Sequence, residues 1–294
     1  MSIGVKSCFI CKKLPVVASM AIATAAIGLS ASISSAAMVA YDTASNYAPS
    51  SWSSTPPNLG SGFGPWNIVL QNNTNPPYVG TYLNSGGAVA TGGYSWGVYA
   101  NNGPGRIDLY RPFTPLPGGY VDPSGLGTLI NNTFSLEMAS DGVGGNSSFV
   151  GFSLQTGQTP SATNDITFEY TGGGSDGMTL IDNNGTNFNT GSNTEYGTVS
   201  FGNLNGGILV TVAVGDNPDG LNPYTITATN VPGTTTYFSY SGSENGPLQQ
   251  VDLFDQQTDG NGYFNDLSIV PEPGSLGMLA LGAVGLLIRR RRKT

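Results

Sequence analysis

Apolar and polar residues alternate with a period of two over most of the chain between residues 41 and 270. The alternation is clearest at 133–138 and 166–170, and a longer apolar run at 208–214 fits a strand covered on both faces. Successive side chains of a strand point to opposite faces, so the pattern predicts strands with a buried side. No stretch of this segment has the apolar spacing of an amphipathic helix.

Similar short runs follow one another along the segment, separated by clusters of Gly, Asn, Asp and Pro that favour turns. They fall at 67–73, 94–101, 106–113, 147–155, 177–182, 194–201, 223–229, 234–240, 248–254 and 263–270. A dozen or more short strands in one stretch predict an all-β fold, an antiparallel β-sandwich of the jelly-roll type. We expect this domain to span 66–270, after an irregular lead-in at 38–65 that is rich in Ser, Pro and Gly.

The N-terminus has the pattern of a secretory signal peptide. Basic residues precede residue 14, and no charge follows until Asp42. A basic flank, an apolar stretch and a run of small residues predict a signal helix that is removed, with the signal at 1–37. The alternative is a retained membrane anchor. Both cysteines, Cys8 and Cys11, lie within this segment, so the mature chain is expected to contain no thiol.

The C-terminus combines a short motif, an apolar stretch and a basic end. Pro271-Glu272-Pro273 is followed by fifteen uncharged residues at 274–288 and then by five basic residues. Fifteen residues are shorter than the ~20 that cross a bilayer comfortably, which predicts a short transmembrane helix. The basic cluster is expected to stay in the cytoplasm, which places the acidic domain on the far side of the membrane.

This C-terminal pattern, over 271–294, resembles the PEP-CTERM sorting signal of Gram-negative bacteria. The resemblance implies recognition and cleavage near Pro271, Glu272 and Pro273 by an exosortase, a membrane transpeptidase-like enzyme. It also implies delivery to the cell surface, the outer membrane or an extracellular polysaccharide matrix. An ordinary tail anchor is the alternative for the same residues.

Charge and composition exclude several classes of function. Residues 41–270 contain two arginines, Arg106 and Arg111, against 17 carboxylates, a balance of −15. Nucleic acid is therefore not expected as a partner, since phosphate binding needs clustered Lys or Arg. The chain has no histidine, which excludes Ser-His-Asp catalysis and His-ligated metal sites.

A second, weaker resemblance concerns the central domain. The segments 95–100, 149–154 and 262–269 are similar to strands of concanavalin A-like or LamG-like jelly rolls, and the last resembles the closing strand of many carbohydrate-binding sandwiches. This resemblance implies the fold rather than a binding activity.

A loop near the end of the domain contains candidate calcium ligands. The oxygen-bearing residues Asp255, Asp259, Asn261 and Asp266 surround glycines, and calcium prefers six to eight oxygen ligands on such a loop. The spacing only loosely follows the helix–loop–helix calcium site, so the alternatives are a structural calcium clip and an ordinary polar loop. No other cofactor is implied.

Aromatic residues supply a candidate carbohydrate-binding platform. Trp52, Trp66 and Trp96 all fall in the first part of the mature chain, with several tyrosines nearby. Such rings can stack on sugar rings, or they can pack the lead-in onto the sheet, because aromatic side chains bury large areas. Both interpretations are open from the sequence.

Two glutamates on predicted strands, Glu137 and Glu169, are the carboxylates that a catalytic pair would use. Glycoside hydrolysis needs a pair of carboxylates across the scissile bond, and Glu137 and Glu169 lie opposite the apolar side of their strands. No Glu-x-Asp-x-x-Glu arrangement of the laminarinase-like type occurs in the chain. Both residues are more simply solvent-facing, and no catalytic residue is assigned.

The two arginines of the domain fall on opposite faces of one predicted strand. Arg106 and Asp108 are expected to form a surface ion pair, which contributes little to stability. Arg111 shares its face with apolar neighbours. If that face is the core, Arg111 must pair with a carboxylate, since burying a lone charge costs too much.

Taken together, the sequence predicts an exported, non-enzymatic protein that displays a β-sandwich at the cell surface or in the extracellular matrix. A structural or adhesive role in exopolysaccharide or biofilm is the leading hypothesis. A lectin-like carbohydrate-binding module is the alternative, and a carboxylate-based glycoside hydrolase comes third. The expected partners are the exosortase, the membrane through the C-terminal helix before processing, and extracellular polysaccharide.

Overall fold

A computed structural model describes most of the chain after the predicted signal segment. The described ranges are 38–48, 52–53, 55–71, 78–101, 105–116, 125–145, 148–172, 177–189, 195–256 and 258–272. The predicted signal helix and the predicted C-terminal transmembrane helix lie outside them. Among the described residues, no helix has the length and apolar character needed to cross a membrane.

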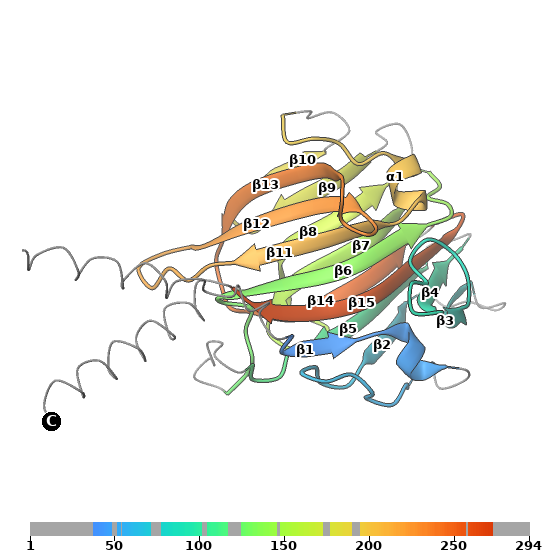
Figure 1. Ribbon diagram of the computed structural model, residues 1–294, viewed down its shortest axis with the longest axis horizontal. Helices are drawn as coiled ribbons and strands as arrows, with labels where there is room; N and C mark the ends of the chain where they lie inside the picture. Colours follow the sequence, from blue (N-terminus) through green and yellow to red (C-terminus); the bar gives the residue numbers. More distant parts are fainter. Residues whose placement is uncertain are drawn as a thin grey trace, which may run out of the picture. The chain divides into compact units, whose positions relative to one another are not determined.

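In the described part of the chain, the strands form two antiparallel sheets (Figure 1). The eight-stranded sheet contains β1 (Ala40–Asp42), β3 (Val79–Asn84), β4 (Ser95–Ala100), β6 (Asn132–Ser140), β11 (Ile208–Val214), β12 (Asn222–Asn230), β13 (Thr236–Glu244) and β15 (Asn261–Pro271). The seven-stranded sheet contains β2 (Asn67–Gln71), β5 (Arg106–Pro112), β7 (Phe149–Thr156), β8 (Thr163–Thr171), β9 (Gly177–Asp182), β10 (Asn187–Asn189) and β14 (Leu248–Gln256).

The strand order confirms the jelly-roll type of sandwich. The sheets run β13-β12-β11-β6-β15-β4-β3, with β1 also paired to β15, and β10-β9-β8-β7-β14-β5-β2. Strands far apart in sequence, such as β6 and β15 or β7 and β14, are therefore hydrogen-bonded neighbours. The last two strands, β14 and β15, thus lie inside the two sheets, whereas the early strands β2 and β3 form edges, and long connections of this kind are typical of jelly rolls.

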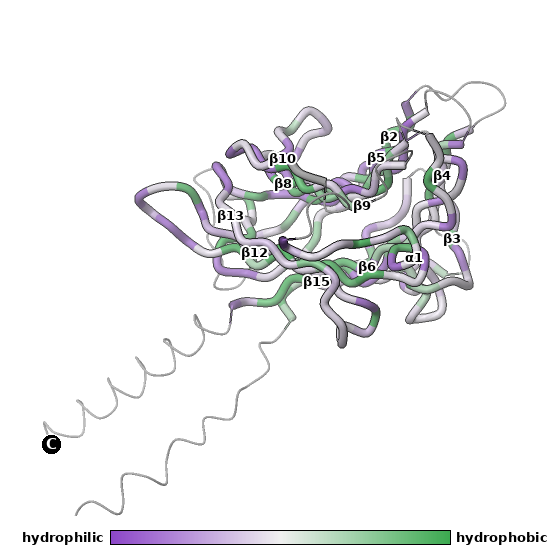
Figure 2. The backbone as a smooth tube through the Cα atoms, turned by 90° about the horizontal axis from the view of Figure 1, so that it is seen from above, coloured by the Kyte–Doolittle hydropathy of each residue, from purple (hydrophilic) through white to green (hydrophobic). Residues whose placement is uncertain are grey.

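The core lies between the two sheets, which Figure 2 shows as two layers. The apolar positions of the period-two pattern face inward: Phe134 and Met138 of β6 and Phe152 and Phe168 of the opposite sheet are all fully buried. The pattern therefore predicted the core correctly wherever alternation was regular, because one face of each strand is removed from water.

One predicted strand is wrong. The stretch 194–201 was expected to be extended, but it leads into a short helix, α1 (Phe201–Asn205). Ser200 caps this helix: its hydroxyl accepts from the backbone N–H of Asn203, whose side-chain oxygen accepts from the Ser200 N–H over 2.9 Å. Such a reciprocal cap satisfies free N–H groups at a helix start and outweighs the local alternation.

The lead-in predicted at 38–65 contributes to the sandwich. Its β1 pairs with β15, and a 3₁₀ helix, η1 (Ala44–Tyr47), follows directly. Ala44 and Tyr47 are fully buried and Phe63 is nearly so. Among the described residues of this segment only the three of β1 form a strand, so regular alternation has little room to show.

Arg111 lies on the core face of β5 and is fully buried. Its Nη2 donates to Oδ2 of Asp42, which is equally buried, over 2.7 Å. The Tyr47 hydroxyl donates to the same oxygen over 2.7 Å, and the guanidinium lies 4.8 Å from the ring centre of Trp66. The inference that Arg111 pairs with a carboxylate is confirmed, since a lone charge there would be too costly.

The expected pair of Arg106 and Asp108 also forms, but it is not a surface pair. Arg106 Nε donates to Asp108 Oδ1 over 2.6 Å, and the side chain of Asp108 is only 1 % exposed. On the outward face of β5, the turn after β7 lies against Tyr110, whose hydroxyl donates to the Pro160 carbonyl over 3.3 Å. Sequence alternation places a residue on a face, but it does not show whether that face is covered.

Candidate functional site

Three tyrosines gather on the outward face of the eight-stranded sheet. Tyr82 of β3, Tyr99 of β4 and Tyr263 of β15 are half-buried, and their strands are adjacent. The Tyr82 ring centre lies 6.3 Å from that of Tyr99 and 6.4 Å from that of Tyr263. We call these three residues, together with Asp141 after β6, the tyrosine face.

Glycines on the neighbouring strands let two of these rings lie against the sheet. Gly97 stands opposite Tyr82, and a Cβ built there would come within 2.6 Å of the Tyr82 ring. Gly80 stands opposite Tyr99, and its Cβ would come within 2.5 Å of the Tyr99 hydroxyl. Glycine within a strand weakens the sheet, so its presence at both positions marks a close approach.

A chain of hydrogen bonds joins the rings to a carboxylate. Tyr82 donates to the Tyr263 hydroxyl over 3.2 Å, and Tyr263 donates to Asp141 Oδ2 over 2.5 Å. The Asn261 side chain donates to the same oxygen over 2.9 Å, and its backbone N–H donates to Oδ1 over 2.6 Å. These bonds fix the orientation of Tyr263 and of the carboxylate.

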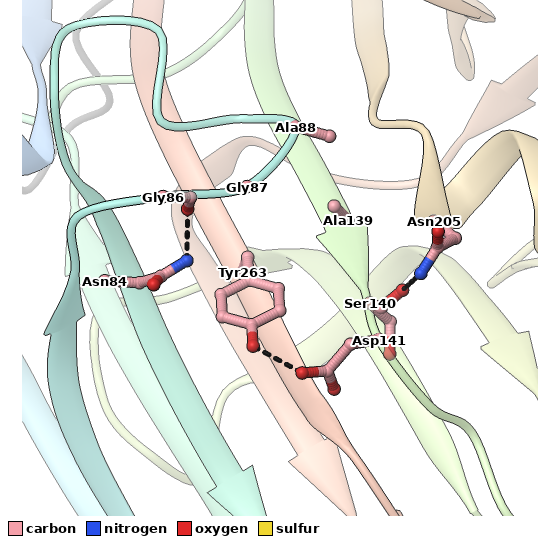
Figure 3. Close-up of a pocket in the computed structure, with 9 residues that line it drawn as sticks. All are labelled: Asn84, Gly86, Gly87, Ala88, Ala139, Ser140, Asp141, Asn205 and Tyr263. Atoms are coloured by element: carbon pink, nitrogen blue, oxygen red, sulfur yellow. Dashed lines mark hydrogen bonds between the residues drawn. The ribbon is translucent and has the colours of Figure 1, made fainter.

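Beside Tyr263 lies a hollow of about 390 Å³. Figure 3 shows the Tyr263 ring standing between Asp141 and the turn that begins at Asn84, with Asn205 on the far side. Asn205 donates to the Ser140 carbonyl over 3.1 Å. The hollow thus exposes one aromatic ring beside a carboxylate and two side-chain amides.

The hydrogen bonds set the ionisation of this site. Partial burial would raise the pKa of Asp141, but hydrogen bonds from Tyr263 and Asn261 outweigh it and hold that pKa below its usual value. Burial and the bond to Asp141 raise the pKa of Tyr263. At neutral pH the site therefore presents a carboxylate and neutral phenols.

A loop at 85–93 forms one wall of the hollow and covers Glu137. Asn265 donates to the Val89 carbonyl over 2.9 Å, and the Thr91 hydroxyl lies 2.9 Å from Glu137 Oε2 and 3.1 Å from an oxygen of Asp266. Burial raises the pKa of Glu137 to about 7. Asp266 stands at a bulge of β15 with a φ of 50°, which turns its side chain toward this loop.

The three tryptophans lie inside the sandwich. Trp52, Trp66 and Trp96 are 7 %, 6 % and 0 % exposed, and their rings pack against one another with centres 5.2 to 5.7 Å apart. With so little exposed area they offer no open ring face to a sugar. Their burial agrees with the packing interpretation rather than with the binding platform.

The four calcium candidates have separate sets of partners. Asp255 is fully buried and accepts from the Thr258 hydroxyl over 2.7 Å and from the Gly262 N–H over 3.0 Å. Asn261 bonds Asp141, whereas Asp266 accepts from Thr91. Across the described ranges, no group of three or more acidic, histidine or cysteine side chains is placed to hold a metal ion.

Calcium binding by this loop stays a prediction. Asp259, the most exposed of the four candidates, shares a hollow of about 340 Å³ with Asp141. The calcium hypothesis predicts that the melting temperature of the purified chain rises by several degrees in calcium and falls back with chelator, because a ligand that binds only the folded state stabilises it. The rise should vanish in Asp259→Ala and persist in Asp219→Ala. No shift in the unaltered protein would contradict it.

The two glutamates considered for catalysis lie on different sheets. Glu137 is on the outward face of β6 in the eight-stranded sheet, and Glu169 is on the outward face of β8 in the seven-stranded sheet. The core separates these faces, so the two carboxylates cannot flank one scissile bond as glycoside hydrolysis requires. Glu169 is half-buried, and burial raises its pKa.

The first residues of the predicted sorting motif are attached to the sandwich. Pro271 is the last residue of β15 and pairs with Asn132 of β6. Glu272 donates its N–H to the Asn131 carbonyl over 3.0 Å, and its side chain accepts from Thr133 over 2.5 Å. Pro273 lies outside the described residues. The motif therefore starts where the closing strand ends.

Sequence reasoning missed Tyr263 and Asp141 as site residues. Tyr263 alternates with the buried Phe264, so the alternation could have placed it on the outward face. Its neighbours Tyr82 and Tyr99 come from strands much earlier in the chain, Tyr82 being 181 residues away, and no sequence pattern shows that β4 pairs with β15.

Residues 270–292 match the PEP-CTERM protein-sorting motif. The chain thus carries a sorting signal that implies export, processing by an exosortase, and a surface or extracellular destination in a Gram-negative bacterium. No curated protein sequence matches the chain.

Several solved structures are similar in fold at low sequence identity. The Trypanosoma cruzi calreticulin globular domain is 11 % identical with a TM-score of 0.43, covering 77 % of this chain and 95 % of that one. The VIP36 exoplasmic/lumenal domain, bound to Ca²⁺ and Man3GlcNAc, is 8 % identical with a TM-score of 0.40 and coverage of 70 % and 84 %. The PL-14 alginate lyase of Aplysia kurodai is 11 % identical with a TM-score of 0.37 and coverage of 65 % and 87 %. These similarities are too distant to indicate a ligand or an activity.

Proposed function

We propose that this exported protein is a non-catalytic adhesin of the cell surface or extracellular matrix, and that it holds polysaccharide on its tyrosine face. The observation that carries the proposal is the arrangement of Tyr82, Tyr99 and Tyr263 beside the ionised Asp141. Aromatic rings with an apolar face and a polar edge stack on sugar rings, while carboxylates and amides bond sugar hydroxyls. The sorting signal delivers the domain to the place where such polysaccharide is found.

The charge of the domain favours an uncharged polysaccharide. The segment 41–270 carries two arginines against 17 carboxylates, and neither arginine lies on the tyrosine face, since Arg111 is in the core and Arg106 faces outward from the other sheet. An acidic polymer would be repelled by Asp141 and by the field of the whole domain. We therefore infer a neutral, hydroxyl-rich chain as the ligand.

The test is binding of the purified full chain to neutral polysaccharides by affinity electrophoresis, using dextran, mannan, xylan and β-glucan gels. Tyr263→Ala should weaken binding about fivefold, because an aromatic contact contributes about 1 kcal/mol. Asp141→Asn should weaken it less, since an amide still bonds a hydroxyl.

Tyr240→Ala, on β13 at the opposite edge of the same sheet, is the matched control and should bind like the unaltered protein. Equal retardation of all three variants would contradict the assignment of the site. Stronger retardation by alginate than by every neutral gel would contradict the inferred ligand class.

A further inference from the structure

A third hollow lies on the outward face of the seven-stranded sheet, on the other side of the core from the tyrosine face. It is a groove of about 310 Å³ bounded by β2, β5, β14 and the turn after β7. Its polar lining includes Gln71, Arg106, Asp108, Gln155, Asn164 and Asp252.

The floor of the groove is a pair of buried carboxyl groups. The side chains of Asp108 and Asp252 are each only 1 % exposed, and the guanidinium of Arg106 lies against both. Asp108 is fully partnered, because Arg106 Nε donates to one oxygen over 2.6 Å and Gln71 donates to the other over 2.7 Å. One guanidinium thus serves two carboxyl groups.

Asp252 has an acceptor with no partner. Its Oδ2 lies 3.7 Å from Arg106 Nη2, but its Oδ1 accepts no hydrogen bond from any residue that the structure describes. A buried acceptor without a donor is costly, so a donor that reached the floor of the groove would satisfy it.

The groove contains one guanidinium and two carboxyl groups. Burial and the neighbouring Asp108 raise the pKa of Asp252 well above its ordinary value, because a second negative charge is disfavoured there. Arg106 then balances Asp108. A metal ion would find one free oxygen where calcium needs six or more, and an anion would meet two carboxyl groups.

Sugar hydroxyl groups match the hydrogen-bonding groups that the groove offers, one acceptor on Asp252 and donors on Arg106. A sugar hydroxyl can donate to the free oxygen of Asp252, and the guanidinium of Arg106, whose side chain is 28 % exposed, can donate to a neighbouring sugar oxygen. Amides of Gln155 and Asn164, joined by a bond of 2.6 Å, continue the polar wall.

We propose that this groove is a second carbohydrate site, which binds one sugar unit of a neutral glycan through Asp252 and Arg106. Because the two outward faces of the sandwich are separated by its core, one chain would hold two polysaccharide strands and cross-link them. The cross-linking rests on the proposed function of the tyrosine face, but the groove itself does not.

Isothermal titration of the purified full chain with cello-, laminari-, manno-, malto- and xylohexaose tests both sites separately. We expect two oligosaccharide molecules to bind per chain. They are either two molecules of one probe, or one molecule each of two probes added in turn. Asp252→Leu should weaken one of the two events at least tenfold and leave the other unchanged. Asp252→Asn should keep both, because its amide oxygen still offers an acceptor to a sugar hydroxyl. Arg106→Met is a second groove variant should Asp252→Leu not fold.

Each outcome decides. One equivalent that is lost in Tyr263→Ala and unaffected by Asp252→Leu would overturn the groove and leave the proposed function standing. One equivalent lost in Asp252→Leu but kept in Tyr263→Ala would establish the groove and contradict the tyrosine face. No heat with any probe would overturn both sites.

Discussion

Replacing Arg111 by Met should lower the free energy of unfolding by about 3–5 kcal/mol, because it leaves a buried carboxylate without its cation. For a domain of this size such a loss lowers the melting temperature by about 10 °C. Asp42 is fully buried, and desolvation already raises its pKa despite the charge of Arg111. Denaturant unfolding followed by tryptophan fluorescence measures the change.

The double variant Asp42→Leu/Arg111→Met is the control for this prediction. Removing both charges avoids the uncompensated carboxylate, so the double variant should be more stable than Arg111→Met alone. The Tyr47 hydroxyl still accepts from Trp66 Nε1 over 2.9 Å after the loss of Asp42. A single variant as stable as the unaltered protein would show that the buried pair does not stabilise the sandwich.

The domain should be more stable at pH 5.5 than at pH 7.5. Burial raises the pKa values of Glu137, Glu244 and Asp255 to about 7 each, while the ordinary values are 4.5 for Glu and 3.8 for Asp. Between those limits the folded state holds a proton that the unfolded state has released, so stability falls as pH rises. Between pH 5.5 and pH 7.5 we expect a loss of about 2 kcal/mol for each group, or about 6 kcal/mol together.

Glu244→Gln isolates one of these contributions. The amide keeps the acceptor that Asn222 reaches over 2.9 Å, but it cannot ionise, so the variant should lose about a third of the pH slope and gain stability at pH 7.5. Glu195→Gln, on an exposed turn, is the matched control and should leave the slope unchanged. Salt at 0.5 M separates this effect from repulsion between surface charges, which it screens. A flat or rising profile would contradict the account.

The fold was predictable because alternation is regular where strands are half-buried. Strands such as β6 and β8 have apolar residues at every second position, and these positions are the core. Where another local rule competes, prediction fails: the cap formed by Ser200 and Asn203 starts a helix inside an expected strand. The short β1 has too few residues for any period to show.

The sites were predictable only in part, because both depend on which strands are neighbours. The apolar neighbours of Arg111 on its own strand were enough to predict that it pairs with a carboxylate if buried. The identity of that carboxylate, Asp42, follows only from the tertiary fold. The tryptophans were the obvious aromatic candidates, and composition alone cannot separate a buried ring from an exposed one. Tyr263 can be recognised as a site residue only from the pairing of β15 with β4, which brings it beside Tyr82 and Tyr99.

The central claim is that the tyrosine face binds a neutral polysaccharide. The most direct measurement is retardation of the purified full chain in native gels containing a neutral polysaccharide, with Tyr263→Ala and Tyr240→Ala run beside it. The account predicts that at least one neutral gel retards the unaltered protein and Tyr240→Ala equally, and that Tyr263→Ala binds that polysaccharide about fivefold more weakly. Retardation by none of the neutral gels, or equal retardation of all three proteins, would contradict it.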